Sequence, residues 1–336
     1  MSVSEPSEES LRRAGELLQS GELVAFPTET VYGLGANALS QEAVSRIFQA
    51  KGRPSDNPLI VHVPSLEAAK PLVGEIDQIS AKLAHAFWPG PLTIVLPIDG
   101  AANRVAPNVT AGLNTVGIRV PEHPVALALL NEAKVPLAAP SANKSGSPSP
   151  TTAGHVLNDY QNSEYRPSMI INGGSCDVGL ESTVVHVGSD EKIHILRPGK
   201  ITPEMIADCL GILIESIQKS YSVEDIDVPR APGMKYKHYS PHAVVVVVSD
   251  WSLIEIKEGD LVASFDSTVI SQASGFDRVS FGSSRDDVET ASNRLFDIFR
   301  SADDMRAKRV LVDCTFDIHS GLGAALWNRI SKAASV

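Results

Sequence analysis

The sequence predicts an α/β fold in two unequal domains, and three observations lead to this prediction. Short apolar segments alternate with segments of helical periodicity along most of the 336 residues. Most of these apolar segments are continuous runs, which is typical of strands buried on both faces of a sheet. At about 150 residues per domain, the chain is also long enough to form two separate cores.

The first domain begins with an amphipathic helix and continues with alternating strands and helices. The first helix is expected to start after Pro6, to place Leu11 and Leu18 on its buried side, and to stop at Gly21. Ser40 is a suitable N-cap for a second helix. Further strands are expected at Leu23–Phe26, Pro58–Val63, Leu92–Leu96, Val116–Val120 and Leu137–Ala139, and further helices at Ile76–Phe87 and Pro124–Ala133.

The regular pattern breaks down between Ile217 and His242, where prolines accumulate and apolar periodicity is lost. We interpret this segment as an interdomain linker and divide the chain into residues 1–214, a linker at 215–242 and a small α/β domain at 243–336. The remaining elements are strands at 169–171, 183–187, 193–196, 243–248, 261–265 and 310–312, and helices at 203–210, 288–300 and 323–332.

The overall charge restricts the classes of function. The formal net charge is −11, and residues 1–240 carry 19 Lys and Arg against 26 Asp and Glu. Non-specific nucleic-acid binding over a whole surface depends on Lys and Arg, so the chain does not fit that class. The polar N-terminus and the absence of an apolar run of about 20 residues lead us to expect a cytoplasmic protein without a membrane span.

Metal and disulfide chemistry find no support in the cysteine pattern. The three cysteines, Cys176, Cys209 and Cys314, are widely spaced and form no CxxC motif. We therefore expect reduced thiols, no structural zinc and no direct protein ligands to a metal.

Three loop-rich segments carry cations and few or no acids. Ala101–Pro121 and Ala133–Asn158 contain Lys or Arg without a carboxylate, and residues 51–57 contain two cations and one acid. If the fold brings these segments together, they form a local anion site on an acidic protein. The alternative is that they are ordinary polar turns.

The residue types favour a polyphosphate as the anion. Lys51 and Arg53 flank a glycine at a helix end and offer a point charge and a planar fork. The small-residue loop Ala139–Asn143 follows a strand, where ligands of open α/β sheets bind. Neither segment is a Walker A loop, and Gly33–Gly35 alone is too weak to indicate a dinucleotide site.

Three further residues have both a structural and a functional interpretation. His62 interrupts an apolar strand, Arg119 lies inside a strand and requires an anion from protein or ligand, and Ser182 begins a strand. The sequence contains neither a GxSxG elbow nor a pair of site-like carboxylates. The chemistry that remains is positioning and charge neutralisation around a phosphate.

Six motifs occur in a fixed order along the first domain, and a seventh lies in the linker. They are Phe26–Gly35, Lys51–Leu59, Trp88–Thr93, Gly117–Pro121, Ala139–Asn143 and Glu181–Val185, followed by the linker Ala231–Pro241. The six motifs resemble the YrdC-like domain, and the rest of the chain resembles the C-terminal domain of the two-domain threonylcarbamoyl-AMP synthases. This resemblance implies a YrdC-like twisted mixed sheet with flanking helices, followed by a smaller Rossmann-like domain.

The resemblance also implies a reaction. Enzymes of this family condense L-threonine, bicarbonate or CO2, and ATP to threonylcarbamoyl-AMP and pyrophosphate, with Mg²⁺ accompanying ATP. A downstream transferase complex then uses the adenylate to modify tRNA. By resemblance, threonine is held by Thr30, His62, Arg119 and Ser182, and ATP by Lys51, Arg53, Asn57, Thr115, Ser141, Asn143, Ser149 and Arg197.

The linker suggests a lid. Lys235, Tyr236, Lys237, His238 and Tyr239 form a cationic and aromatic segment, which we expect to fold over the ATP cleft. The alternative is a plain spacer.

Two other functions compete with the synthase. The first is a YrdC-like RNA-binding module without adenylate chemistry, which the acidic first domain disfavours. The second is a hydrogenase-maturation carbamoyltransferase, a class that contains a similar domain together with zinc-finger-like regions. The lack of CxxC motifs disfavours that class.

Overall fold

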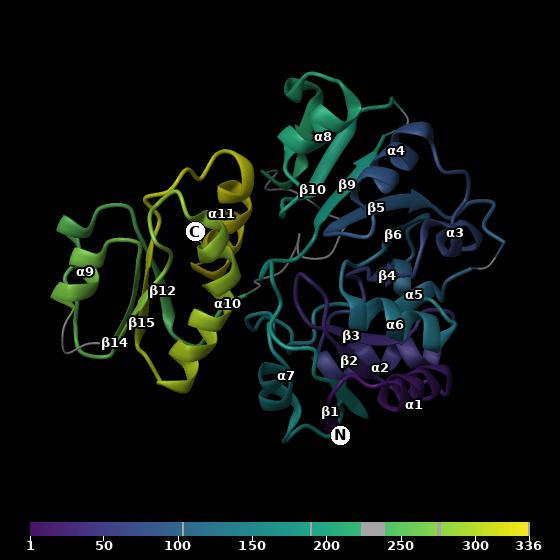
Figure 1. The fold of residues 1–336 in the computed structure, drawn as a ribbon, viewed down its shortest axis with the longest axis horizontal. Coiled ribbons are helices and arrows are strands. Elements are labelled where there is room, and N and C mark those ends of the chain that lie inside the picture. The colour runs from purple at the N-terminus through teal and green to yellow at the C-terminus, as the bar shows by residue number, and fades with distance from the viewer. Residues whose placement is uncertain (103, 189, 223–238, 274–276, 335–336) are drawn as a thin grey trace.

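A large sheet-and-helix domain is followed by a smaller one that packs against it through two helices (Figure 1). The computed structural model describes residues 1–102, 104–188, 190–222, 239–273 and 277–334. The predicted α/β class in two unequal domains is confirmed.

The first domain is built on a mixed sheet whose central strands are buried. Parallel pairs such as β4 with β6 occur beside antiparallel pairs such as β5 with β6, so the sheet is mixed. In sheet order, the strands of the described residues are β1 (Ser2–Ser4), β8 (Met169–Ile171), β2 (Val24–Phe26), β3 (Gly33–Asn37), β7 (Leu137–Ala138), β4 (Ile60–His62), β6 (Thr115–Arg119), β5 (Leu92–Pro97), β9 (Thr183–Val187), β10 (Ile193–Arg197) and β11 (Ile217–Lys219).

The helices of this domain have sequence-encoded ends. Ser7 forms a capping box with Ser10, and Ser40 caps the helix that ends at Gly52, whose φ of 61° suits a residue without Cβ. The helices are α1 (Glu8–Gln19), α2 (Gln41–Lys51), α3 (Leu66–Ala69), α4 (Gln78–Phe87), α5 (Pro107–Thr110), α6 (Pro124–Ala133), α7 (Ala153–Tyr160) and α8 (Pro203–Leu210), with short 3-10 turns at Lys70–Leu72, Ile214–Ser216 and Ser220–Ser222.

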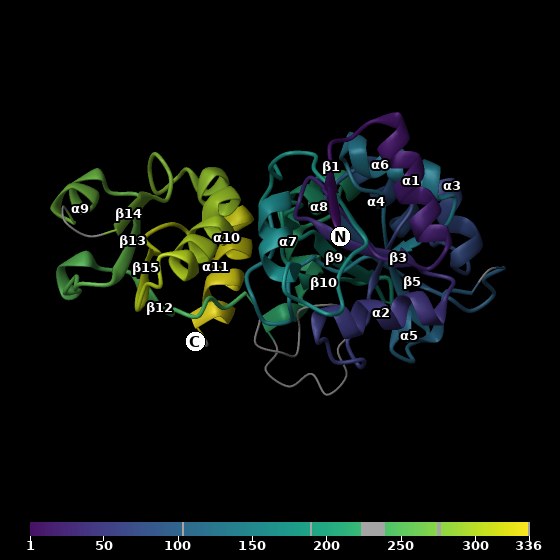
Figure 2. The ribbon, with the colours of Figure 1, turned by 90° about the horizontal axis from the view of Figure 1, so that it is seen from below.

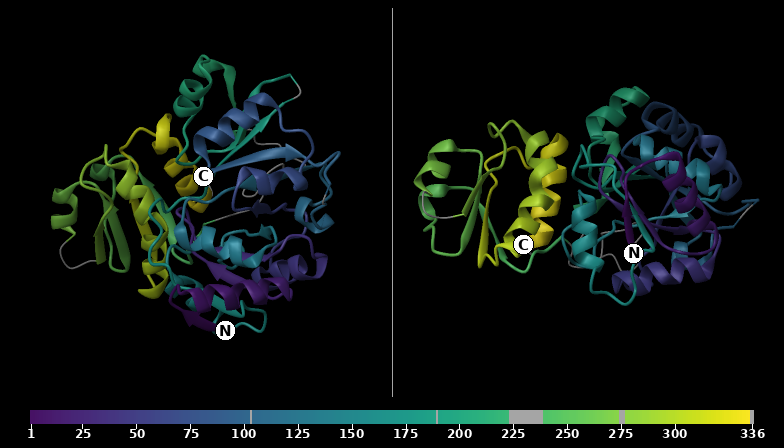
Figure 3. Two further views of the ribbon diagram at one scale, coloured as in Figure 1. Left: turned by 45° about the vertical axis from the view of Figure 1, so that its right-hand side comes forward. Right: turned by 60° about the horizontal axis from the view of Figure 1, so that its bottom comes forward.

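The second domain has a parallel sheet whose hydrophobic core includes Leu295, Phe296 and Leu326 and extends to Val31 and Leu180 of the first domain. Its helices α10 and α11 lie on the side that faces the first domain in every view (Figures 2 and 3). In sheet order the strands are β12 (Val244–Val248), β15 (Arg309–Asp313), β13 (Asp260–Ser264) and β14 (Asp277–Ser280), and the helices are α9 (Ser267–Gln272), α10 (Val288–Asp304) and α11 (Gly321–Ala334), with a 3-10 turn at Trp251–Leu253.

Several elements differ from the sequence prediction. Residues 217–219, which we placed in the linker, form β11 and pair with β10, so the sheet of the first domain continues beyond residue 214. The glycine-rich β3 was missed because its residues have little β propensity and gain their order from pairing with β2 and β7. Among the described residues, we find no helix that is both long and apolar enough to cross a membrane.

Gly15 offers a test of the α1–α6 packing. A Cβ at this position would lie 2.9 Å from the carbonyl carbon and oxygen of Glu132, so Gly15→Ala should lower the free energy of unfolding by about 1–3 kcal/mol. Gly154 in α7 is the matched control, because its Cβ would meet nothing nearer than 3.7 Å. Gly154→Ala should leave stability unchanged or raise it by up to about 1 kcal/mol. Equal denaturant midpoints for the two variants would contradict the close helix contact.

Candidate active site

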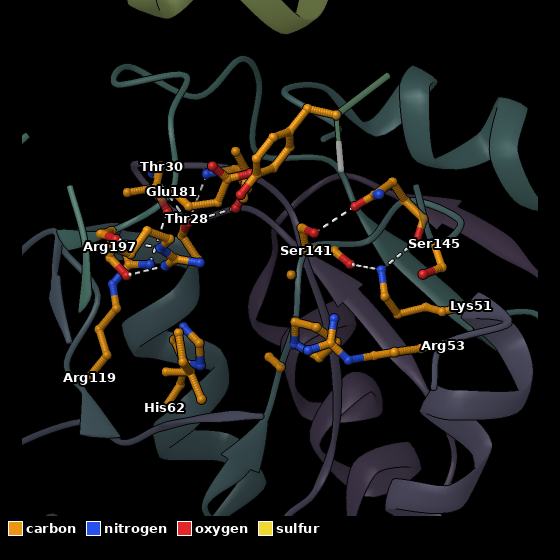
Figure 4. A pocket seen from close by; sticks show the side chains of 18 of the residues that line it. Thr28, Thr30, Lys51, Arg53, His62, Arg119, Ser141, Ser145, Glu181 and Arg197 are labelled. Atoms are coloured by element: carbon orange, nitrogen blue, oxygen red, sulfur yellow. Dashed lines mark hydrogen bonds between the residues drawn. The ribbon is translucent and has the colours of Figure 1, made fainter. Parts of the chain in front are cut away.

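A pocket opens to solvent beside the central strands (Figure 4). Residues from segments far apart in the sequence meet there, including the ends of β4, β6 and β7 and the end of α2. Of the residues expected to hold threonine or ATP, nine line it: Thr30, Lys51, Arg53, His62, Arg119, Ser141, Asn143, Ser182 and Arg197.

The other three residues expected at the site lie near the pocket without lining it. Asn57 is buried, and its carbonyl accepts hydrogen bonds from Arg53 at 3.4 Å. Ser149 is buried and donates to Glu181 Oε1 at 2.5 Å. Thr115 lines a separate, mainly apolar cavity that shares Ile60 with the pocket.

Lys51 is fixed rather than swinging freely over the cleft. Its side chain is buried, and its ammonium donates to the carbonyl of Ser141 at 2.5 Å and to that of Asn143 (Figure 4). Burial, and then the nearby Arg53, hold the pKa of Lys51 well below its ordinary value. Lys51 therefore ties the end of α2 to the loop that follows β7.

Arg119 has a protein anion. Its guanidinium lies 2.7 Å from the Glu29 carboxylate and donates to Thr30 Oγ1 at 2.9 Å and to the Gly90 carbonyl at 3.3 Å. The side chains of Arg119 and Glu29 are each only 5% exposed. Sequence reasoning missed Glu29, although an acid next to Thr30 in an otherwise uncharged motif was an available signal.

A second buried ion pair joins the pocket to the C-terminal domain. Glu181 lines the pocket, and its Oε2 accepts from Arg329 of α11 at 2.8 Å. Burial alone would raise the pKa of Glu181, but Arg329 and Arg197 together lower it below its ordinary value. Neither Glu181 nor Arg329 was selected from the sequence as a site residue, because their pairing spans 148 positions.

Arg197 holds the start of β9. It donates to the carbonyl of Ser182 and to Ser182 Oγ, both at 3.0 Å. The Ser182 hydroxyl also hydrogen-bonds Thr93 Oγ1 at 2.8 Å. Burial lowers the pKa of Arg197 to about 10, which still leaves it a cation at neutral pH.

His62 is buried at the pocket wall, edge-on to the ring of Phe26. Burial, and then the charge of Arg119, lower the pKa of His62 to about 3. Its Nδ1 is one of the buried polar atoms without a hydrogen-bond partner in the described part of the chain. This neutral ring, with an unused polar atom, fits a ligand contact better than a purely structural role.

The expected lid can be followed only at its last residue. Tyr239 is buried, lines the pocket and packs against Phe296 of α10 with ring centroids 5.3 Å apart. Lys235, Tyr236, Lys237 and His238 lie outside the described residues.

The electrostatics of the pocket suit an anionic ligand. Lys51, Arg53, Arg119 and Arg197 face it, while Glu181 is the one carboxylate among the described residues that line it. No group of three or more potential metal ligands was found among the described residues. The site offers cations, hydroxyls and amides, which bind and orient phosphate and carboxylate groups.

The comparisons with known proteins agree with this geometry. A family model described as telomere recombination matches residues 16–199, and one described as threonylcarbamoyl-AMP synthase, C-terminal domain, matches residues 201–335. The fold and site thus define a two-domain enzyme with a YrdC-like domain.

Full-length relatives define the family more closely. The threonylcarbamoyl-AMP synthases of Bacillus subtilis and Pyrococcus abyssi are 40% and 42% identical over 99% of this chain, which covers 94% and 97% of theirs. The crystal structure of P. abyssi Sua5 complexed with L-threonine matches with a TM-score of 0.82 and 37% identity, over 99% of this chain and 96% of that one. The chain belongs to the threonylcarbamoyl-AMP synthase family.

The buried His62 makes a prediction about pH. Its pKa is about 3 in the folded chain and ordinarily 6.5, so between these values the unfolded state binds one more proton. The contribution of His62 to the free energy of unfolding is fully present above pH 6.5, and it falls by about 1.4 kcal/mol for each unit by which the pH decreases below that value. Denaturant unfolding between pH 7.5 and 5 should show this slope.

Two variants isolate the His62 contribution. His62→Asn should reduce the slope of the free energy of unfolding against pH by the amount that corresponds to one bound proton. His85→Asn, at an exposed position, should leave this slope unchanged. The same pH dependence in wild type and His62→Asn would contradict a neutral, buried His62.

Proposed function

We propose that this chain condenses L-threonine, bicarbonate or CO2, and ATP into threonylcarbamoyl-AMP and pyrophosphate. The observation that carries the proposal is the convergence of four cations from separate motifs on one pocket in a member of this enzyme family. Such a pocket is adapted to bind a carboxylate and a polyphosphate together.

Threonine occupies the end formed by Thr30, His62, Arg119 and Ser182. Arg119 takes the substrate carboxylate while Glu29 holds its guanidinium in place, because a charge-assisted hydrogen bond requires a fixed donor. The Thr30 and Ser182 hydroxyls lie at this end and can recognise the substrate hydroxyl. Such partners penalise an amino acid that lacks the hydroxyl.

ATP extends from the end formed by Lys51, Arg53 and the loop of Ser141 and Asn143 to Arg197, which lies beside Ser182. Arg53 provides a fork for phosphate oxygens, and Lys51 keeps the loop in place. By resemblance we also assign Asn57, Thr115 and Ser149 to the ATP set; none of the three lines the pocket. Mg²⁺ enters as part of the nucleotide substrate, with phosphates and water as its ligands, because the one carboxylate lining the described pocket is already paired.

The reaction needs positioning more than acid–base chemistry. The threonine amine bonds to the carbon of CO2 and loses a proton, which gives a carbamate. A carbamate oxygen then attacks the α-phosphorus of ATP, the bond to the β-phosphate oxygen breaks, and pyrophosphate leaves with the electron pair. The pocket cations neutralise the charge on the phosphates, and holding the reactants together lowers the barrier by several kcal/mol, on the order of that seen in intramolecular reactions.

Tyr239 is the described residue of the proposed lid, and Lys235, Tyr236, Lys237 and His238 lie outside the described residues. The position of Tyr239 between the pocket and Phe296 supports this role, because closure there shields the adenylate from water. We further propose a cytoplasmic enzyme whose product passes to a downstream transferase complex, with tRNA as the indirect beneficiary. The RNA-binding alternative has no support in an acidic first domain.

Pyrophosphate release tests the proposed reaction. Purified chain with Mg-ATP and bicarbonate should release pyrophosphate when threonine is added, and far less with valine or alanine, which lack the hydroxyl. Release that does not depend on threonine would overturn the proposal.

Steady-state kinetics should separate the two ends of the pocket. Arg53→Met should raise KM for ATP about tenfold or more with little change for threonine, and Thr30→Ala, which removes a hydroxyl bonded to Arg119, should do the reverse. Arg119→Ala is a poorer probe because it leaves Glu29 buried without its cation, at a cost of about 3–5 kcal/mol. A rise in both KM values for each variant would contradict the assignment of separate ends.

A further inference from the structure

Helices α10 and α11 of the C-terminal domain contact the loops that build the pocket. Arg300 of α10 makes a two-pronged ion pair with Asp159, both at 2.9 Å, and donates to the Pro148 carbonyl at 2.6 Å. Asn293 donates to the carbonyls of Cys176 and Asp177 at 2.7 and 2.9 Å. The small domain is thereby attached to the two loops that precede Ser149 and Ser182.

Arg329 of α11 is the most buried of these interface residues and contacts a residue that lines the pocket. Its side chain is fully buried, its Nε donates to Glu181 Oε2 at 2.8 Å and its Nη1 donates to the Pro198 carbonyl at 2.8 Å. Its guanidinium also lies 5.6 Å from the ring centroid of Tyr239. Arg329 does not line the pocket. It contacts the pocket residues Glu181 and Tyr239 and the carbonyl of Pro198, which follows the pocket residue Arg197.

The charge of Glu181 needs this partner. Glu181 faces a pocket that has to accept a polyanion, and its carboxylate accepts from Arg329 on one oxygen and from Ser149 on the other. Without Arg329, the carboxylate would repel the phosphates and would draw Arg197 away from them. One uncompensated buried charge at such a site changes binding about tenfold or more.

We propose that Arg329 is a positioning residue supplied by the C-terminal domain, which neutralises Glu181 and so keeps the pocket receptive to the phosphates of ATP. This assignment rests on the proposed function and gives the small domain a direct part in forming the ATP site. Arg329 and Glu181 form a unit in which the arginine is needed only because the carboxylate is there.

Kinetics of the full-length chain with paired variants test the assignment. Arg329→Met should raise KM for ATP about tenfold or more, and Arg329→Lys should stay within about threefold of wild type because the charge remains. Adding Glu181→Gln to Arg329→Met should bring KM for ATP back to within about threefold of Glu181→Gln alone.

A matched control distinguishes neutralisation of Glu181 by Arg329 from a role of Arg329 in holding the two domains together. Glu289 of α10 pairs with Lys200 across the same interface at 2.8 Å, and both side chains are exposed. Glu289→Gln should leave KM for ATP unchanged. An unchanged KM for ATP in Arg329→Met overturns the proposal, and so does a defect that persists in the double variant, which would indicate loss of domain contact instead.

Two measurements distinguish a failure of the Arg329 proposal from a failure of the proposed reaction and from misfolding of the variant. Calorimetry should show that a non-hydrolysable ATP analogue binds about tenfold more weakly to Arg329→Met than to wild type. If wild type releases no pyrophosphate, the proposed reaction is overturned, but this difference in binding still tests the role of Arg329. If Arg329→Met does not fold, the double variant decides: the proposal stands if its KM for ATP matches that of Glu181→Gln and falls if it does not.

Discussion

The pocket depends on one constraint: a cation buried in a protein must be compensated by anions or dipoles of the chain. Lys51 meets it with the carbonyls of Ser141 and Asn143, and Arg119 meets it with Glu29. Each solution brings together segments that are distant in the sequence. The positive charge needed by the ligands is therefore also what holds the walls of the pocket in place.

This constraint links the two domains. Arg329 of the small domain compensates Glu181 of the large one, and Arg300 binds Asp159 and the loop before Ser149. Both arginines are at most 10% exposed at the side chain. A domain interface made of buried ion pairs tolerates little displacement of one domain relative to the other, because a small shift leaves buried charges unpaired. The small domain therefore acts on the shape and charge of the pocket without lining it with its own helices.

Local signals predicted much of the fold, and long-range pairing accounts for what they missed. Ser40 and Gly52 mark the ends of α2 through capping, so that helix was readable from the sequence. Strand β3 contains two glycines and is ordered by its neighbours, and β11 is a short strand added to a sheet edge, so neither had a strong local signal. Arg119 was identifiable as a candidate site residue because a cation in a buried strand requires an anion, and Lys51 and Arg53 because they flank a glycine at a helix end. Their partners Glu29 and Arg329 were not, because a pairing partner is defined by the folded chain.

The central claim is that the pocket holds threonine by its carboxylate and leaves the amine to take up CO2 before ATP is attacked. Mass spectrometry of the adenylate formed with ¹³C-bicarbonate, threonine and Mg-ATP tests it most directly. The account predicts an adenylate that contains threonine and one ¹³C carbonyl carbon. An unlabelled adenylate joined directly to the threonine carboxylate would contradict it.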